Sequence, residues 1–110
     1  MRIDATEIGR TFGRQTRAYA EYRIFASAAR AGAPVRQVAI SLIPDARGLG
    51  VACSLVVGLE SGKAVRITAR GRHAYDAINR AALRLGRVLR QESGDVPEAG
   101  DAGGRGEPSR

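Results

Sequence analysis

Apolar and polar residues alternate along four short segments of the chain, and apolar residues recur with a longer period along another. Alternation predicts strands with one buried face each, and the alternating segments are residues 2–6, 35–43, 51–60 and 65–70. Residues 14–30 contain many Ala and Arg and neither Gly nor Pro, which favours a helix. Residues 73–91 place apolar side chains every three or four positions, as an amphipathic helix does.

The predicted elements follow one another in the order β-α-β-β-β-α. This order predicts an α+β fold, a two-layer sandwich with two helices on one face of a four-stranded sheet. On the second helix, the side chains expected to face the sheet are Tyr75, Ile78, Ala82, Leu85 and Leu89. On the strands, the expected core positions are Val38, Ile40, Leu42, Cys53, Leu55, Val57, Leu59, Val65, Ile67 and Ala69.

The composition of the chain changes near residue 92. Residues 93–110 are rich in Gly, Pro and acidic residues and hold one large aliphatic side chain, so this stretch buries too little apolar surface to fold. We therefore expect a folded domain at 1–92 and a disordered acidic, Gly-rich tail at 93–110. Four acids and two arginines fall in the tail, which leaves the expected domain with 16 cations, 7 acids and a net charge of +9.

The sequence contains one cysteine and one histidine, Cys53 and His73. A single thiol forms neither an internal disulfide nor a Cys-based zinc site, and the apolar strand face around Cys53 predicts a buried, inert thiol. The glycines at 48–50 and 58–62 do not complete a dinucleotide or phosphate-binding motif, and no G-x-S-x-G is present. We therefore expect no enzyme activity, no metal, no cofactor and no small-molecule substrate.

The sequence also carries no signal for a membrane. No apolar run approaches the roughly 20 residues of a membrane-spanning helix, and the N-terminus lacks the apolar segment of a signal peptide. A single thiol agrees with a reducing compartment. These features predict a cytoplasmic protein without a membrane partner.

Arginine dominates the basic residues and accounts for 17 of the 18 cations. On the second predicted helix, Arg80, Arg84 and Arg87 recur at i, i+4 and i+7 and share a face opposite the expected core, which Arg90 extends. Residues 77–91 of this helix include no acid, and Asp76 lies one turn before Arg80, where the two can pair.

Arginines of the first predicted helix point to the same chemistry. Arg23 and Arg30 share one face of that helix. If both helices pack on one sheet face, we expect the arginines of the two helices to border a single groove. A guanidinium binds phosphate through paired hydrogen bonds and stacks on bases, so the pattern favours RNA over a membrane surface.

A second group of cations follows the last strand and the start of the second helix, with His73 at its end. The members of this group are Lys63, Arg66, Arg70 and Arg72. Cations at the start of a helix oppose the helix dipole, which favours an anion bound among them. For His73 itself we expect a surface or capping role.

Two segments resemble a known protein family. The run RGRHAYDAIN at 70–79, followed by LGRVLR at 85–90, is similar to the last helix of the ribosome hibernation promoting factors, also called ribosome-associated inhibitors or sigma-54 modulation proteins. The run RAYAEYRI at 17–24 resembles the first helix of the same family. The resemblance extends over nearly all of residues 1–91 and is to the short class of the family.

The resemblance implies the same β-α-β-β-β-α fold and binding without catalysis. Family members occupy the channel for mRNA and tRNA on the small ribosomal subunit, contact 16S rRNA through basic helix residues, and silence translation during starvation. It also implies that Ala20 and Ile24 face the sheet. By position, the rRNA contacts would be Arg23, Arg80, Arg84, Arg87 and Arg90, with Lys63, Arg66, Arg70 and Arg72 as a second candidate group.

Two other functions remain open from the residues alone. A double-stranded RNA-binding module, with the order α-β-β-β-α and a basic last helix, has a similar pattern, although the extra first strand and the motif at Tyr75 argue against it. A protein-interaction module would use the sheet face opposite the helices. That face carries small side chains, at Ala39, Ser41, Ala52, Ser54 and Val56.

Overall fold

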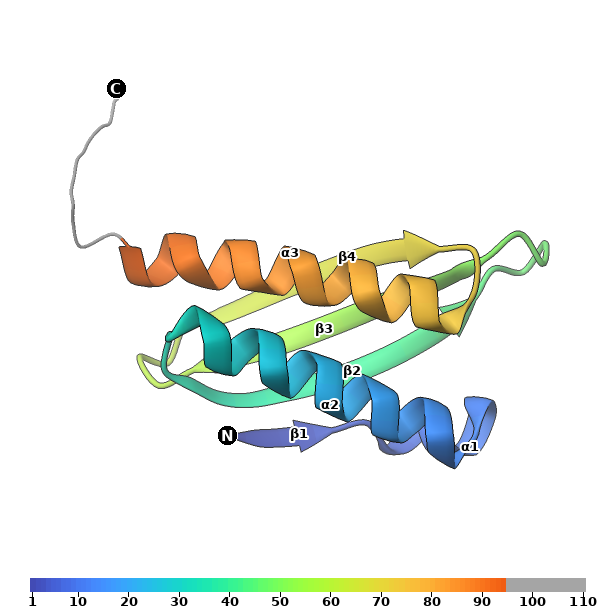
Figure 1. Ribbon diagram of the computed structural model, residues 1–110, viewed down its shortest axis with the longest axis horizontal. Helices are drawn as coiled ribbons and strands as arrows, with labels where there is room; N and C mark the ends of the chain where they lie inside the picture. Colours follow the sequence, from blue (N-terminus) through green and yellow to red (C-terminus); the bar gives the residue numbers. More distant parts are fainter. Residues whose placement is uncertain (95–110) are drawn as a thin grey trace, which may run out of the picture.

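A computed structural model of the chain describes residues 1–94 and shows two layers, a four-stranded sheet and two long helices that lie across one face of it (Figure 1). The elements are β1 (Arg2–Asp4), α1 (Thr6–Phe12), α2 (Arg14–Ala31), β2 (Val35–Pro44), β3 (Val51–Leu59), β4 (Ala64–Gly71) and α3 (Ala74–Gly94). The strand order is β1-β2-β3-β4, with β1 parallel to β2 and the other pairs antiparallel. The predicted α+β sandwich is confirmed.

Helix α1 is the element that the sequence pattern did not predict. The Asp4 carboxylate starts it by accepting hydrogen bonds from the Thr6 backbone N–H at 3.1 Å and the Thr6 hydroxyl at 2.8 Å. Gly13, at a φ of 96°, then separates α1 from α2. Because Ile8 is the one buried side chain in these seven residues, no apolar period exists from which a helix could be recognised.

The core lies between the sheet and the long helices. The inward positions of β2 and β3 are buried as predicted, and on β4 Ile67 and Ala69 are buried while Val65 is half-buried. Ala20 and Ile24 of α2 are fully buried against the sheet, as the family resemblance implied. On α3 the buried stripe includes Ile78, Ala82, Leu85 and Leu89.

Tyr75 corrects the predicted core stripe of α3. Its side chain is 40% exposed, because it lies at the edge of the helix–helix contact and stacks on Tyr19 of α2 instead of facing the sheet. The ring centroids are 4.6 Å apart and the ring planes differ by 21°. The aromatic ring therefore joins the two helices rather than the two layers.

Gly71 fixes where α3 starts relative to the sheet. A Cβ at this position would lie 2.3 Å from the backbone nitrogen of Ala77, closer than any real side-chain contact. Only glycine lets the end of β4 touch the first turn of α3 so closely. Helix α3 then runs antiparallel to β4 and continues to Gly94, two residues past the expected boundary at 92. The rest of the predicted tail, 95–110, lies outside the described residues.

No helix among residues 1–94 covers the other face of the sheet. Ala39, Ser41, Ala52, Ser54 and Val56 are exposed or half-buried there, as expected for the outward positions of alternating strands. The register places Ala39 beside Val56 and Ser41 beside Ser54, so these small side chains form a continuous surface.

Candidate nucleic-acid interface

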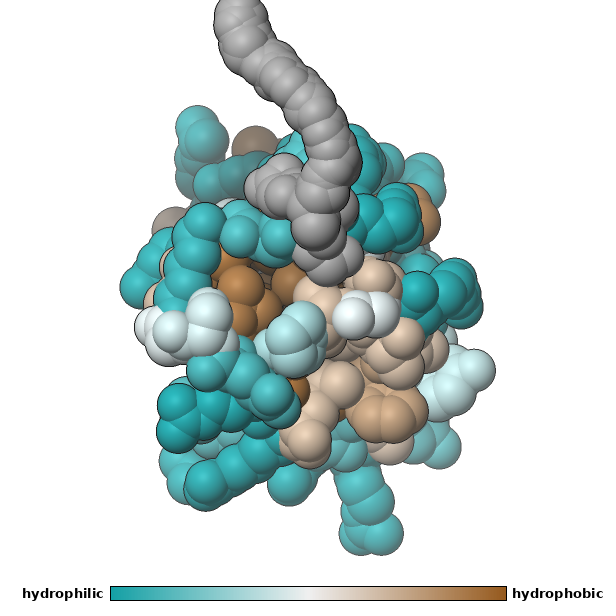
Figure 2. Space-filling view, turned by 90° about the vertical axis from the view of Figure 1, so that its left-hand side faces the viewer, coloured by the Kyte–Doolittle hydropathy of each residue, from teal (hydrophilic) through white to brown (hydrophobic). Residues whose placement is uncertain are grey.

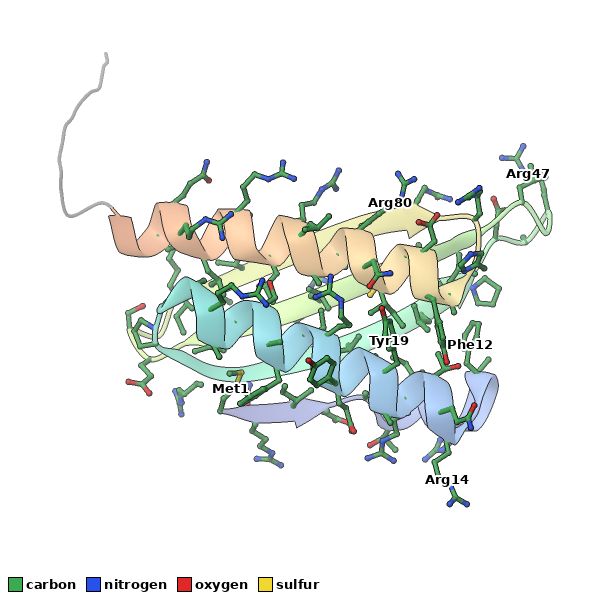
Figure 3. All side chains as sticks on the ribbon, in the orientation of Figure 1. Met1, Phe12, Arg14, Tyr19, Arg47 and Arg80 are labelled. Atoms are coloured by element: carbon green, nitrogen blue, oxygen red, sulfur yellow. The ribbon has the colours of Figure 1, made fainter. Side chains whose placement is uncertain are left out.

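The joint between α2 and α3 is organised around Asn79. The Tyr19 hydroxyl donates a hydrogen bond to the Asn79 side-chain oxygen at 2.6 Å, and the Nε–H of Arg23 donates to the same oxygen at 2.9 Å. Figure 3 shows Tyr19 between the two helices. Two of the motif segments that suggested a family therefore meet in space, and their shared contact holds the Arg23 guanidinium at the helix–helix border. Asn79 belongs to the motif at 70–79, but the sequence alone indicates no role for it.

Small residues let the two helices approach closely further along the joint. The Ser27 hydroxyl donates to the backbone oxygen of Ala82 at 2.6 Å, and a Cβ on Gly86 would lie 3.2 Å from the Ser27 Oγ. Above this contact lies a small groove of about 100 Å³. It is lined by Arg23, Ser27, Arg30, Ala82, Leu83, Gly86 and Arg90. We call it the α2–α3 groove.

A second hollow of about 210 Å³ lies on the other side of α3, where the helix borders the edge strand β4. We call it the α3–β4 hollow, and its lining residues are Ala69, Arg70, Arg80, Leu83, Arg84 and Arg87. Arg84 reaches down to the sheet, where its Nη1 donates a hydrogen bond to the backbone oxygen of Thr68. The edge strand is thereby tied to the helix through one of the candidate residues.

The expectation that all helix arginines border one groove is wrong. Successive residues of an α-helix are rotated by about 100°, so Arg90 lies roughly 60° around α3 from Arg87, toward α2. Arg90 therefore lines the α2–α3 groove with Arg23, whereas Arg80, Arg84 and Arg87 line the α3–β4 hollow. Leu83 lies between the two, with 63% of its surface exposed.

Charge compensation differs among these arginines. Asp76 pairs with Arg80, at 3.2 Å between Oδ1 and Nε, as the sequence spacing suggested. Arg23, Arg30 and Arg90 form one row of arginines along the α2–α3 groove, and Arg80, Arg84 and Arg87 form a second row along the α3–β4 hollow. Within residues 1–94, no carboxylate lies within ion-pairing distance of the members other than Arg80, which are Arg23, Arg30, Arg84, Arg87 and Arg90. Figure 3 shows nitrogen-tipped side chains along the outer side of α3. The helix layer therefore presents positive charge that the described residues leave unbalanced.

The second predicted group of cations is not brought together. Lys63 lies in the β3–β4 turn, and its Nζ pairs with the carboxylate of Glu92 near the end of α3, at 3.0 Å. Arg66 alternates with buried Ile67 and so projects from the helix-free face of the sheet. Arg70 lies 3.9 Å from Asp45 at the opposite end of β4 from Lys63. The strand carries these side chains along its whole length, which separates them.

The start of α3 is compensated by the protein's own carboxylate. Asp76 accepts a hydrogen bond from the backbone N–H of Arg72 at 2.9 Å, while its own backbone N–H donates to Nδ1 of His73 at 3.3 Å. This reciprocal arrangement is a helix cap, and it confirms the capping role expected for His73. The hydrogen bond from the backbone N–H of Arg72, and then the one from the side chain of Arg80, lower the pKa of Asp76. Asp76 pairs with the Arg72 guanidinium at 3.6 Å and with that of Arg80 at 3.2 Å, so two cations share one carboxylate.

The remaining chemistry-bearing residue, Cys53, lies in the core. The predicted burial of Cys53 is confirmed, and this burial raises the pKa of its thiol to about 12. Residues 1–94 contain no group of three His, Cys, Asp or Glu side chains arranged for a metal ion. None of the helices in this part of the chain is both long and apolar enough to span a bilayer.

Figure 2, which views the end of the molecule where α3 finishes, shows hydrophilic side chains around an apolar centre.

Fold and surface together define a small α+β domain with a basic helix layer. The N-terminal domain of Protein Y from Thermus thermophilus has a similar structure, with a TM-score of 0.62 over 83% of this chain and 94% of that chain, at 19% sequence identity. This likeness confirms, for the fold, the resemblance drawn from the sequence. No protein-family model matches the sequence, and a search of curated proteins gives no significant match.

Proposed function

We propose that this chain is a ribosome-associated protein of the hibernation type, which binds the small ribosomal subunit through its helix layer. The N-terminal domain of Protein Y from Thermus thermophilus has a similar fold, in agreement with the resemblance of the sequence to the hibernation factors. The motif segments around Tyr19, Tyr75 and Asn79 support the same assignment, because they form the joint that gives the two helices their spacing.

The observation that carries the proposal is the set of uncompensated arginines on α2 and α3. Several like charges on one layer repel one another in the free protein, and contact with phosphates relieves that repulsion. Each phosphate contact also releases condensed counterions from the RNA, which favours binding at low salt. A net charge of +9 over the described residues, which hold 16 cations and 7 acids, makes a polyanion the natural partner.

Three arginines are already oriented for such contacts. A guanidinium has five N–H donors, and Arg23 and Arg84 each use one of them to bind Asn79 or the backbone of Thr68. The anchoring bond limits the motion of the side chain, so less conformational entropy is lost when the other donors bind a phosphate. Arg80, which Asp76 holds in place, is positioned in the same way.

In this proposal the protein acts by occupancy, and no bond is made or broken. The helix layer contacts 16S rRNA in the channel that mRNA and tRNA use, and translation stops because those ligands are excluded. Arg23, Arg80, Arg84, Arg87 and Arg90 supply the main contacts. Lys63, Arg66, Arg70 and Arg72 do not form a group of their own, and three of them lie near carboxylates, so they contribute less. Arg70 lines the α3–β4 hollow and so adds to the contacts made there.

The test is sedimentation of the purified protein with separated small and large ribosomal subunits over a range of salt. We expect binding to the small subunit, loss of affinity as salt rises from about 50 to about 200 mM, and displacement by mRNA together with tRNA. Equal affinity for a free RNA duplex would favour a double-stranded RNA-binding module instead. Binding to neither subunit at low salt would contradict the proposal.

A further inference from the structure

We propose that α3 binds as a ridge between two separate segments of RNA backbone, one in the α2–α3 groove and one in the α3–β4 hollow. This inference rests on the proposed function and specifies the RNA that the site accepts. The ligand is structured RNA that offers two backbone segments on either side of a helix, and not one continuous single strand.

The two rows of arginine lie on opposite sides of an exposed apolar crest. Leu83 lines both the groove and the hollow, and it offers no hydrogen-bond donor. Arg90 lies only about 60° around α3 from Arg87, so the separation of the two rows comes from Arg23 and Arg30, which stand on α2. The axes of packed helices lie about 8–10 Å apart. One strand that used both rows would have to cross Leu83, where no cation compensates its phosphates.

Each row is long enough for a stretch of backbone. Arg87 lies seven positions after Arg80 along α3, which corresponds to a rise of about 10 Å. The other row runs along both helices, since Arg23 and Arg30 on α2 face Arg90 on α3. Neither row depends on a single side chain, and Arg30, Arg87 and Arg90 have no carboxylate partner within residues 1–94.

The apolar crest predicts recognition of shape rather than sequence. Leu83 cannot hydrogen-bond to a base edge, whereas the flanking arginines bind phosphates of any sequence. In an A-form helix the minor groove is wide and shallow, with a backbone on each side. A crest flanked by two rows of cations matches that arrangement, and it also matches two RNA segments brought together by folding of the rRNA.

Tethered cleavage of the RNA tests the geometry directly. The buried Cys53 leaves single surface cysteines as the reactive positions, so an iron chelate can be attached to Arg30→Cys in one row and Arg87→Cys in the other. Arg14→Cys serves as the control, because this side chain points away from α3 (Figure 3). We expect cleavage from positions 30 and 87 in two distinct RNA segments or on opposite strands of one helix, and little from position 14.

Salt dependence tests the two rows independently. Arg30→Ala with Arg90→Ala and Arg84→Ala with Arg87→Ala should each reduce the slope of log affinity against log salt by about 2. Their combination should reduce it by the sum, since the rows contact different segments. Arg2→Ala with Arg14→Ala removes the same charge from the β1 side of the molecule and should leave the slope nearly unchanged.

The outcomes separate this inference from the function on which it rests. Overlapping cleavage from positions 30 and 87 on one short stretch of one strand would overturn the ridge geometry while the protein remains a ribosome binder. The ridge geometry would also be overturned if one pair of arginine substitutions accounted for the whole reduction of the salt slope. The other pair would then leave the slope unchanged, as Arg2→Ala with Arg14→Ala should. If the unmodified protein binds no small subunit at low salt, the function and the geometry fall together.

Discussion

Leu85 and Leu83 are two residues apart on α3, yet one is fully buried and the other is 63% exposed. Replacing Leu85 by Ala removes three buried carbons, which at about 0.8 kcal/mol each gives roughly 2.5 kcal/mol of lost transfer free energy. The cavity that remains between helix and sheet adds up to about 2 kcal/mol, since α3 is held to β4 at Gly71 and cannot collapse freely. We therefore expect Leu85→Ala to lower the free energy of unfolding by about 2.5–4.5 kcal/mol.

Leu83→Ala is the matched control, with the same change of side chain on the same helix. We expect it to alter the free energy of unfolding by less than about 0.5 kcal/mol. Urea unfolding followed by circular dichroism measures both variants, and thermal unfolding should place Leu85→Ala at least about 10 °C below the control. Similar losses in the two variants would refute the burial pattern of α3, and with it the assignment of the surface that carries the arginines.

Three further results follow from the structure. Gly71→Ala should destabilise the domain by at least about 1–3 kcal/mol, because its Cβ meets the backbone of Ala77, whereas Gly9→Ala meets only a flexible arginine side chain and should be tolerated in urea unfolding. Because the pKa of Asp76 is lowered in the folded protein, its carboxylate stabilises the fold above the ordinary value of 3.8, and this effect is lost as pH falls through the folded-state pKa. Asp76→Asn should therefore make the free energy of unfolding less dependent on pH in that acidic range. An unchanged dependence of the unfolding free energy on pH would contradict this. Cys53 should resist alkylation in the native protein at pH 8 (about four units below its pKa) and react only after unfolding; mass spectrometry that shows rapid native labelling would oppose its burial.

The sequence predicts the layers well where burial has a regular period. Alternation in β2 and β3 has a period of two and places Val38, Ile40 and Leu55 in the core. On α3, apolar residues every three or four positions identify Leu85 and Leu89 as core residues. Those patterns depend on local geometry alone, and local geometry can be inferred from the order of residues.

Features that depend on distant partners could not be predicted in the same way. Tyr75 fits the apolar period of α3, but its ring stacks on Tyr19 of α2 and does not face the sheet. The order of residues groups Lys63 with its neighbours on β4, whereas its partner in the structure is Glu92, 29 residues away. The division of the arginines into two rows depends on which elements flank α3, and that is decided by the packing of α2 and β4.

The central claim is that the arginines of α3 bind the small ribosomal subunit. Its most direct measurement is the affinity for purified small subunits, at one low salt concentration, of a variant in which Arg80, Arg84 and Arg87 are replaced by Glu. The comparison is Arg2→Glu with Arg14→Glu on the β1 side, and circular dichroism confirms that both variants are folded. We predict that the α3 variant loses binding and no longer inhibits cell-free translation, while the comparison variant retains most of both. A folded α3 variant that binds and inhibits like the unmodified protein would contradict the account.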